Sequence, residues 1–365
     1  MQNLNLRERF LKLMRFEPVD RVPYWDFAWW DETLDRWHKE GLPEDVHPRD
    51  FFGMDRCFEE SYIQGAEFRF LPAFEEKILE EDANTQIVID VTGTKLKRFK
   101  QKQGVSIPHF LEFPVKNRKD FNEIIKRLNP ESPARYPRNW EDYKKSVKDR
   151  TYPLLIHCGG FFGWARELMG IENLSIAFYE DKSLIVDMFD FRLDFTLKVL
   201  KKAVEEIDID AGFFWEDMAY NKGSLLSPKL FKELMVPRYK KITEFLYKNN
   251  IKINFVDCDG NIDELLPLWL ESGINGMFPL EMAGNSDPVK YRKLYGKNVL
   301  LMGGIDKIEL AKGKTEIENE VKRVSDVIKS GGYIPFADHR VPPDVSLENY
   351  LYYLKLIKKE CNFTA

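Results

Sequence analysis

The chain of 365 residues is 44% hydrophobic and 32% charged, with a formal net charge of −5. This composition supplies a large core and excludes a disordered chain, and the mixed charges without a basic stripe exclude nucleic acid as the expected partner. A small-molecule ligand is the better expectation.

The N-terminal part is predicted to begin with an amphipathic helix at 4–16. Its apolar residues recur at helical spacing, and Pro18 ends the run. The next apolar run, VPYWDF, predicts a strand at 22–26.

An antiparallel excursion is predicted at 74–100, where alternating runs on both sides of Gly93 indicate a β-hairpin or a small antiparallel sheet. Residues 101–150 are rich in Pro, Lys and Asp. We expect them to cross the surface, with a helical piece around NRKDFNEIIKRL.

From residue 151 onward, short apolar runs alternate with helical patterns such as the one at 183–206, which indicates βαβ units and a parallel sheet. With 22–26 and a weaker candidate at 54–60, the strands number about eight, as in a closed (β/α)8 barrel. We therefore predict an α/β protein forming one TIM-barrel domain over 1–365, with the excursion inserted. An open doubly wound sheet is the rival, although no G-x-G-x-x-G follows an early strand. The six later strands are predicted at 153–158, 210–215, 251–256, 274–279, 298–302 and 332–337.

The cysteines show no C-x-x-C spacing, which is typical of a reducing compartment. The N-terminal segment carries charges throughout, and no stretch of about 18 uncharged apolar residues occurs in the sequence. We expect a cytoplasmic protein without disulfides or a membrane span, and its oligomeric state stays open, with a homodimer as one possibility. The four cysteines are Cys57, Cys158, Cys258 and Cys361.

Candidate functional residues follow the predicted strands, because a barrel presents its functional groups at the carboxyl ends of its strands. These residues are mostly acidic, and we expect them to converge on one mouth. They include Asp26, His157, Glu216, Asp257, Asp259, Asp338, His339 and Arg340.

Carboxylates held together in a partly dry site either share protons or bind a cation. Asp257 and Asp259 alternate at a strand end and should point the same way, with His339 completing a ligand set. This oxygen-rich set suits a hard divalent ion, or zinc with mixed ligands. Glu216 and His339 are the predicted acid/base residues. The competing interpretation is that these groups cap helices or bind loop backbone.

Substrate contacts are predicted for five further residues. His157 lies at a strand end, although a histidine in an apolar strand is often a satisfied core group. Trp25 and Trp29 could form the floor of a site for a planar ligand, or they could pack in the core. Asp338 and Arg340 flank the candidate histidine in sequence.

Four segments carry a family resemblance. They are RERFLKLMRFEPVDRVPYW, FVDCDGNIDELLPLWLESGINGMFPLE, YGKNVLLMGGIDK and GGYIPFADHRVPPDVSLENYLYYL. Together they resemble the uroporphyrinogen decarboxylase superfamily, which includes decarboxylases and the methyltransferases of corrinoid-dependent methyl metabolism. The resemblance spans nearly the whole chain and implies a (β/α)8 barrel.

The chain departs from both branches of that superfamily. True decarboxylases carry an arginine-bearing M-R-Q-A-G-R segment after the first strand, whereas the corresponding stretch here, DFAWWDETLDRW, is acidic and would repel a porphyrinogen's carboxylates. Zinc methyltransferases use an H-x-C pair and a later Cys at places that resemble Asp257, Asp259 and His339 here. Loss of both thiolates disfavours activation of a thiol substrate.

The resemblance therefore favours a methyltransferase-type enzyme that acts on a non-thiol small molecule. It implies a divalent metal and a corrinoid on a partner protein. The alternative is decarboxylation of a porphyrinogen or another aromatic acid, as in tetrapyrrole biosynthesis, without a cofactor and with Asp26 stabilising a protonated ring. A third possibility is a catalytically silent barrel that binds a tetrapyrrole.

Overall fold

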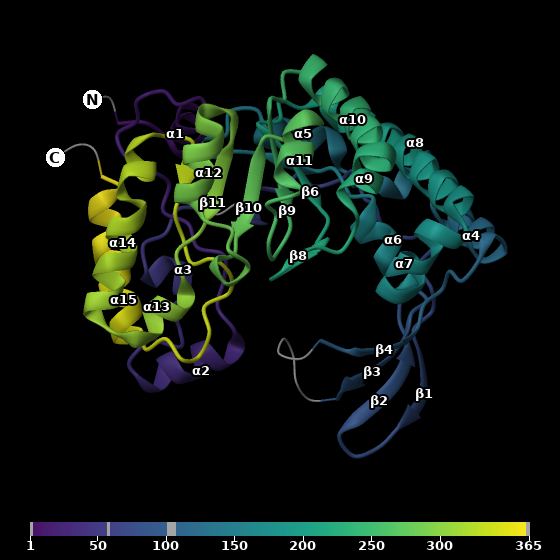
Figure 1. Cartoon of the computed structure of the whole chain (residues 1–365), viewed down its shortest axis with the longest axis horizontal. Helices are drawn as coiled ribbons and strands as arrows, with labels where there is room; N and C mark the ends of the chain where they lie inside the picture. The colour runs from purple at the N-terminus through teal and green to yellow at the C-terminus, as the bar shows by residue number, and fades with distance from the viewer. Residues whose placement is uncertain (1–2, 57–58, 101–106, 363–365) are drawn as a thin grey trace.

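The computed structural model describes residues 3–56, 59–100 and 107–362. Its centre is a six-stranded parallel sheet in the order β12-β11-β10-β9-β6-β5 (Figure 1). These strands are short apolar runs that are almost wholly buried, as expected of a parallel sheet covered by helices. The strands are β5 (Leu155–His157), β6 (Ala211–Trp215), β9 (Ile253–Asp257), β10 (Gly276–Leu280), β11 (Leu300–Gly303) and β12 (Tyr333–Ile334).

Helices alternate with these strands, which confirms the predicted βαβ pattern. The longest is α8 (Lys182–Glu206), where the sequence predicts a helix, and α1 (Leu6–Met14) confirms the predicted N-terminal helix. The remaining helices are α2 (Asp31–Lys39), α3 (Pro48–Phe51), α4 (Arg118–Ile124), α5 (Trp140–Val147), α6 (Phe162–Met169), α7 (Ile171–Glu180), α9 (Pro228–Leu230), α10 (Val236–Lys248), α11 (Leu266–Glu271), α12 (Pro288–Tyr295), α13 (Lys307–Lys312), α14 (Lys314–Lys329) and α15 (Leu347–Glu360).

The sheet is not closed into an eight-stranded barrel by strand pairing among the described residues. Single parallel bridges extend it at both edges: Trp29 pairs with Val341, and Tyr62 with Leu155. The prediction of a strand at 22–26 is wrong, because these residues do not pair as a strand. Of the candidate at 54–60, residues 57–58 lie outside the described part of the chain.

Local side-chain bonding explains why the first predicted strand does not pair regularly. The Asp55 carboxylate accepts a 2.8 Å hydrogen bond from the Tyr24 backbone N–H, and the Asp55 N–H donates to the Tyr24 carbonyl at 3.0 Å. Pro23 has no backbone N–H to give to a ladder. Asp55 therefore occupies both backbone groups of Tyr24, the N–H through its side chain and the carbonyl through its own backbone N–H.

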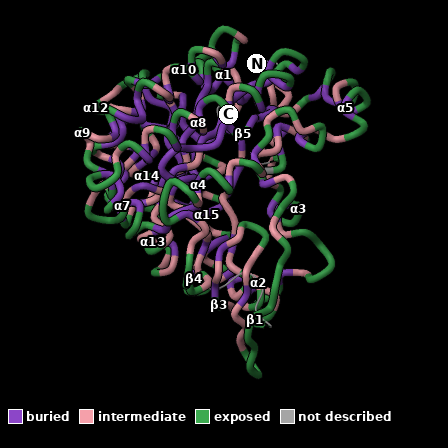
Figure 2. The backbone as a smooth tube through the Cα atoms, turned by 90° about the vertical axis from the view of Figure 1, so that its right-hand side faces the viewer, coloured by how far each residue is buried: buried purple, intermediate pink, exposed green. Residues whose placement is uncertain are grey.

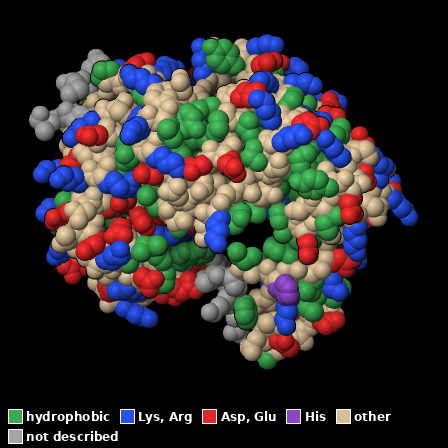
Figure 3. Space-filling view, viewed as in Figure 1, with side chains coloured by type: hydrophobic (Ala, Val, Ile, Leu, Met, Phe, Trp, Pro, Cys, Tyr) green, Lys and Arg blue, Asp and Glu red, His purple; other side chains and the backbone are tan. Residues whose placement is uncertain are grey.

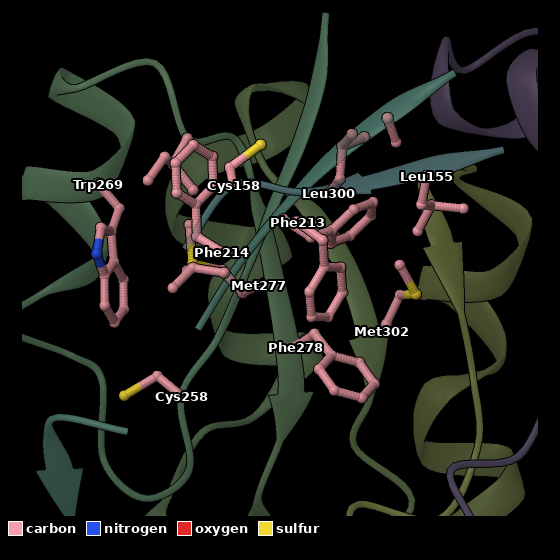
Figure 4. Packing of buried hydrophobic residues seen from close by; sticks show 14 of the residues in the cluster. Leu155, Cys158, Phe213, Phe214, Cys258, Trp269, Met277, Phe278, Leu300 and Met302 are labelled. Atoms are coloured by element: carbon pink, nitrogen blue, oxygen red, sulfur yellow. The ribbon is translucent and has the colours of Figure 1, made fainter. Parts of the chain in front are cut away.

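The core packs on both faces of the parallel sheet (Figure 4). Adjacent residues of β6 point to opposite faces. The Phe213 ring lies 5.4 Å from Phe278 of β10, whereas the Phe214 ring lies 5.5 Å from Tyr239 of α10. One face is thus sealed by aromatic contacts between strands, and the other by the helical layer.

The predicted antiparallel excursion is confirmed and is larger than expected. It forms a four-stranded sheet of β1 (Lys77–Glu81), β2 (Thr85–Ile89), β3 (Lys95–Phe99) and β4 (His109–Glu112). The fourth strand lies within the stretch predicted as a surface crossing. This sheet projects from the body, and its chain is mostly exposed or intermediate (Figure 2). No helix within the described ranges has the length and apolarity needed to cross a lipid bilayer.

Candidate active site

Three carboxylates meet at the carboxyl ends of two neighbouring strands. Strand β6 pairs in parallel with β9, with Trp215 opposite Asp257. One oxygen each from Asp217, Asp257 and Asp259 lies within 4.8 Å of the others, and all three residues are half-buried. We call these three residues the acidic triad.

Backbone bonding fixes the acidic triad. The Glu216 N–H donates to the Asp257 carbonyl at 2.9 Å, and the Asp259 N–H donates to the Asp217 carboxylate at 3.2 Å. Asp217 has a positive φ of 41°, so the chain turns sharply after β6 and brings its side chain toward β9. Burial, and then the neighbouring Asp259 carboxylate, raise the pKa of Asp217. A divalent cation would relieve this repulsion, because hard cations prefer oxygen ligands.

His339 joins the acidic triad from the far edge of the sheet. Its Nε2 lies 3.5 Å from an oxygen of Asp259, so the structure brings these two predicted residues together. The edge of the ring packs against Phe27 with centroids 5.0 Å apart, and Trp30 lies 6.3 Å away. The Arg340 guanidinium lies 5.4 Å from the Trp30 ring. A carboxylate, an imidazole and an aromatic wall therefore share one mouth.

Glu216 does not open into this mouth. It is fully buried, and its two oxygens accept hydrogen bonds of 2.6 and 2.7 Å from the backbone N–H groups of Phe161 and Gly163. It thus binds the N-terminus of α6, where a carboxylate is favoured. Burial raises the pKa of Glu216 to about 7. These contacts are those of a carboxylate that caps a helix, which was the competing interpretation of the sequence, and not those of an acid/base residue in the mouth.

Asp26 is also buried, below the mouth. Its carboxylate accepts a 2.5 Å hydrogen bond from the Tyr350 hydroxyl and a 2.8 Å bond from the Phe27 N–H. Burial raises the pKa of Asp26 to about 7. Only 1% of the residue is exposed, so a ligand in the mouth does not reach its carboxylate.

The aromatic residues of the first segment divide between core and mouth. Trp25 and Trp29 are buried, the former 5.7 Å from Phe10 and the latter 5.6 Å from Phe52 between ring centroids. Both therefore belong to the core. Phe27 and Trp30 of the same aromatic stretch face His339 instead. The sequence did not single them out, because no regular strand alternation exists here.

Asp338 supports the mouth from below. It is fully buried, and its oxygens accept hydrogen bonds from the Met282 N–H at 2.9 Å and from the Lys307 ammonium at 3.2 Å. Burial raises the pKa of Asp338 although Lys307 opposes this shift. Its contacts position the loop that carries His339, and a substrate in the mouth would not touch it.

His157 lies at the end of β5 and lines a separate cavity of about 780 Å³. The imidazole Nδ1 accepts a 3.1 Å hydrogen bond from the Gly159 N–H, which leaves the proton of the neutral ring on Nε2. Surrounding protein, and then the Arg192 cation, lower the pKa of His157 to about 4. The ring is nevertheless accessible from the cavity. His157 is thus a neutral donor facing open space.

Comparisons with known proteins give a family and a fold. The sequence profile of the family described as uroporphyrinogen decarboxylase (URO-D) matches residues 86–360. A solved structure of a methyltransferase from Methanosarcina mazei is similar over 98% of this chain and 99% of its own, with a TM-score of 0.59 and 14% sequence identity. At this identity the likeness concerns the fold alone. A search of curated protein sequences finds no significant match.

Proposed function

The chain belongs to the uroporphyrinogen decarboxylase (URO-D) family, and from this premise we propose that it is a methyltransferase-type member. It moves a methyl group between the oxygen of a small non-thiol molecule and a corrinoid held by a partner protein. The full-length likeness to a methyltransferase supports this proposal loosely. The contents of the mouth support it more directly.

The observation that carries the proposal is the juxtaposition of the acidic triad with His339, whose Nε2 lies 3.5 Å from Asp259. When a methyl group leaves an ether oxygen, that oxygen must gain a proton as the carbon–oxygen bond breaks. His339 is placed to give this proton, and Asp259 to orient the ring and stabilise its charged form. A reduced corrinoid, when bound, would supply the strong nucleophile that accepts the methyl group.

The acidic triad is the proposed cation site. Its donors are all carboxylate oxygens, which suits a hard divalent ion such as Mg²⁺ or Mn²⁺ better than a thiophilic one. Cys258 lies between two of its members in sequence, but the Cys258 thiol is buried and accepts a 3.3 Å hydrogen bond from the Met218 N–H. Burial raises the pKa of Cys258 well above its usual range, so it supplies no thiolate. A cation here would orient an oxygen of the substrate.

Decarboxylation, the reaction after which the family is named, is the alternative. A porphyrinogen would bring several carboxylates to an acidic mouth, and like charges that are desolvated together disfavour binding. Asp26, the group expected to stabilise a protonated ring, is bonded to Tyr350 and closed off from the mouth. Both observations favour methyl transfer over this alternative.

A cobalamin assay tests the proposal. Purified enzyme is mixed with reduced cobalamin and a panel of methoxylated aromatic acids, and methylation of cobalamin is followed by absorbance while carbon dioxide is trapped. We expect methylation, and we expect His339→Gln to slow it by about 10² to 10⁴-fold, the usual effect of losing a general acid. Asp194→Asn, which alters a surface pair with Lys198, is the control and should stay near the wild-type rate. Carbon dioxide release without methylation would contradict the proposal.

A further inference from the structure

The cavity that contains His157 is distinct from the acidic triad but adjoins it. It lies between the segment at 65–73 and the carboxyl ends of β5 and β6, and Trp215 lines its wall. The chain then continues from Trp215 into Asp217 of the acidic triad. Figure 3 shows a hollow with a largely hydrophobic border between the body and the projecting sheet. A volume of about 780 Å³ is within the range of small-molecule pockets.

A buried cation faces this cavity. Arg192 comes from the middle of α8 and is only 5% exposed. Its Nε donates to the Gly160 carbonyl at 3.1 Å, whereas its buried Nη1 has no hydrogen-bond partner among the described residues. No carboxylate within the described part of the chain forms an ion pair with it. Burial lowers the pKa of Arg192 to about 10, and the charges of Glu167 and Glu216 oppose this shift from beyond ion-pair distance. A desolvated guanidinium without a direct ion pair is costly, and an anionic ligand beside it would reduce this cost.

Flat aromatic walls surround this cation. The Arg192 guanidinium lies 4.8 Å from the Phe68 ring centroid and 5.1 Å from that of Trp164, and both rings line the cavity. Trp215 adds a third wall. Aromatic side chains present broad apolar faces that stack well on a planar body. The cavity thus combines one positive end with apolar walls.

Two titratable side chains narrow the class of ligand. His157 presents its Nε2–H, which can donate a hydrogen bond to an anion beside Arg192. Glu167 also lines the cavity and is exposed to it. Its carboxyl group would repel a second negative charge in the same space. A ligand with a single carboxylate therefore fits better than a diacid.

We propose that this cavity binds a planar aromatic monocarboxylate, whose carboxylate lies against Arg192 and His157 and whose ring lies between Phe68, Trp164 and Trp215. That such an acid is also the methyl donor rests on the proposed function. Its binding does not, because no step of methyl transfer is involved.

Calorimetric titration without any corrinoid tests the proposal. The probes are 4-methoxybenzoate, its uncharged amide, and cyclohexanecarboxylate, which lacks a flat ring. We expect wild-type protein to bind the benzoate at least about tenfold more tightly than either of the others, because the amide loses the charge-assisted contact with Arg192 and the cyclohexane ring loses the aromatic stacking. Arg192→Gln should abolish the preference for acid over amide, and His157→Gln should reduce it severalfold.

Arg238→Gln is the matched control, because Arg238 pairs with the exposed Asp190 and does not line the cavity. It should keep the wild-type preference. If Arg192→Gln fails to fold by circular dichroism, His157→Gln and the three probes decide the result alone. Equal binding of acid and amide by wild-type protein would overturn the proposal, as would an unchanged preference in a folded Arg192→Gln protein. Binding without methyl transfer would contradict only the proposed function.

Discussion

At the scale of single residues, most side chains of the mouth could be predicted because they follow the carboxyl ends of the strands. Their individual contacts could not be predicted. Asp257, Asp259 and His339 could be predicted because parallel strands carry their carboxyl ends to one edge. The sequence could not show that Asp217, and not the predicted Glu216, contributes its carboxylate to the mouth. This contribution depends on the positive φ of Asp217, which sends one carboxylate into α6 and the next toward β9.

Cation binding should depend on Asp217, which was not among the predicted metal ligands. Asp217→Asn replaces one of three carboxylates with a neutral amide, and we expect the affinity for Mn²⁺ or Mg²⁺ measured by calorimetry to fall at least about tenfold, since even outer-shell changes typically cost 10 to 100-fold. Asp263→Asn is the control, because Asp263 follows the same strand but pairs with Lys290. A loss of affinity in the control and not in Asp217→Asn would show that the acidic triad is not the cation site.

The buried carboxyl of Asp26 should give stability a pH dependence of known sign. Its pKa in the folded protein is raised from 3.8 to about 7, so the folded state binds more protons than the unfolded chain between these values. The stabilisation is therefore present at low pH and is lost as the pH rises toward 7. Asp26→Asn does not titrate. Its free energy of unfolding relative to wild type should rise over this window, by on the order of 2–4 kcal/mol.

Thermal unfolding of both proteins in steps from pH 4 to pH 9 measures this difference directly. Taking the difference cancels the opposite contribution of His157, whose lowered pKa makes stability rise with pH at the acidic end. A difference that stays level over the whole range would mean that Asp26 is ionised throughout.

At the scale of elements, α6 links the core to both candidate sites. Glu216 binds its N-terminus, and the same helix carries Trp164 into the cavity and Arg166 to the Asp217 carbonyl, with a hydrogen bond of 2.6 Å. The predicted strands and helices of this half of the chain are confirmed because their apolar runs are long and regular. The first segment is different: its apolar run predicts a strand at 22–26, but Asp55 bonds to the backbone of Tyr24 and the segment does not pair as a strand.

Loss of the Glu216 anchor should loosen α6. Glu216→Gln keeps one acceptor oxygen but turns an amide group toward a backbone N–H, and an unsatisfied buried donor typically costs about 1–3 kcal/mol. We expect the urea midpoint to fall accordingly. Glu205→Gln, at a surface pair with Lys201, should leave the midpoint nearly unchanged. Equal midpoints for the two variants would show that the anchor is dispensable.

At the scale of the whole molecule, the structure joins a buried parallel sheet to an exposed antiparallel one. The alternation of apolar runs and helical patterns in the sequence predicts the α/β class and the succession of strands and helices along the chain. It does not predict whether the barrel closes, because closure depends on contacts at the sheet edges, which are made by single bridges. The fourth antiparallel strand was hidden because all residues of β4 are exposed and show no buried face. A single domain and a homodimer both stay predictions.

Local stability should differ between the two sheets. Within the antiparallel strands only Val88 and Leu96 are buried, whereas β9 and β10 are buried almost throughout. Because the antiparallel sheet makes few buried apolar contacts, its local opening should cost little free energy. We expect amide hydrogens of β1 and β4 to exchange much faster than those of β9 and β10 in native-state hydrogen exchange. Equal protection would indicate that the projecting sheet opens only when the whole chain unfolds.

We propose that this URO-D family member transfers a methyl group and does not remove a carboxyl group. One compound can undergo either reaction: 4-methoxybenzoate carrying ¹³C at both the methoxyl and the carboxyl carbon. Incubation with the enzyme and reduced cobalamin, followed by NMR, shows which carbon moves. We expect labelled methylcobalamin together with 4-hydroxybenzoate that keeps its labelled carboxyl. Labelled carbon dioxide with the methoxyl group intact would contradict this proposal.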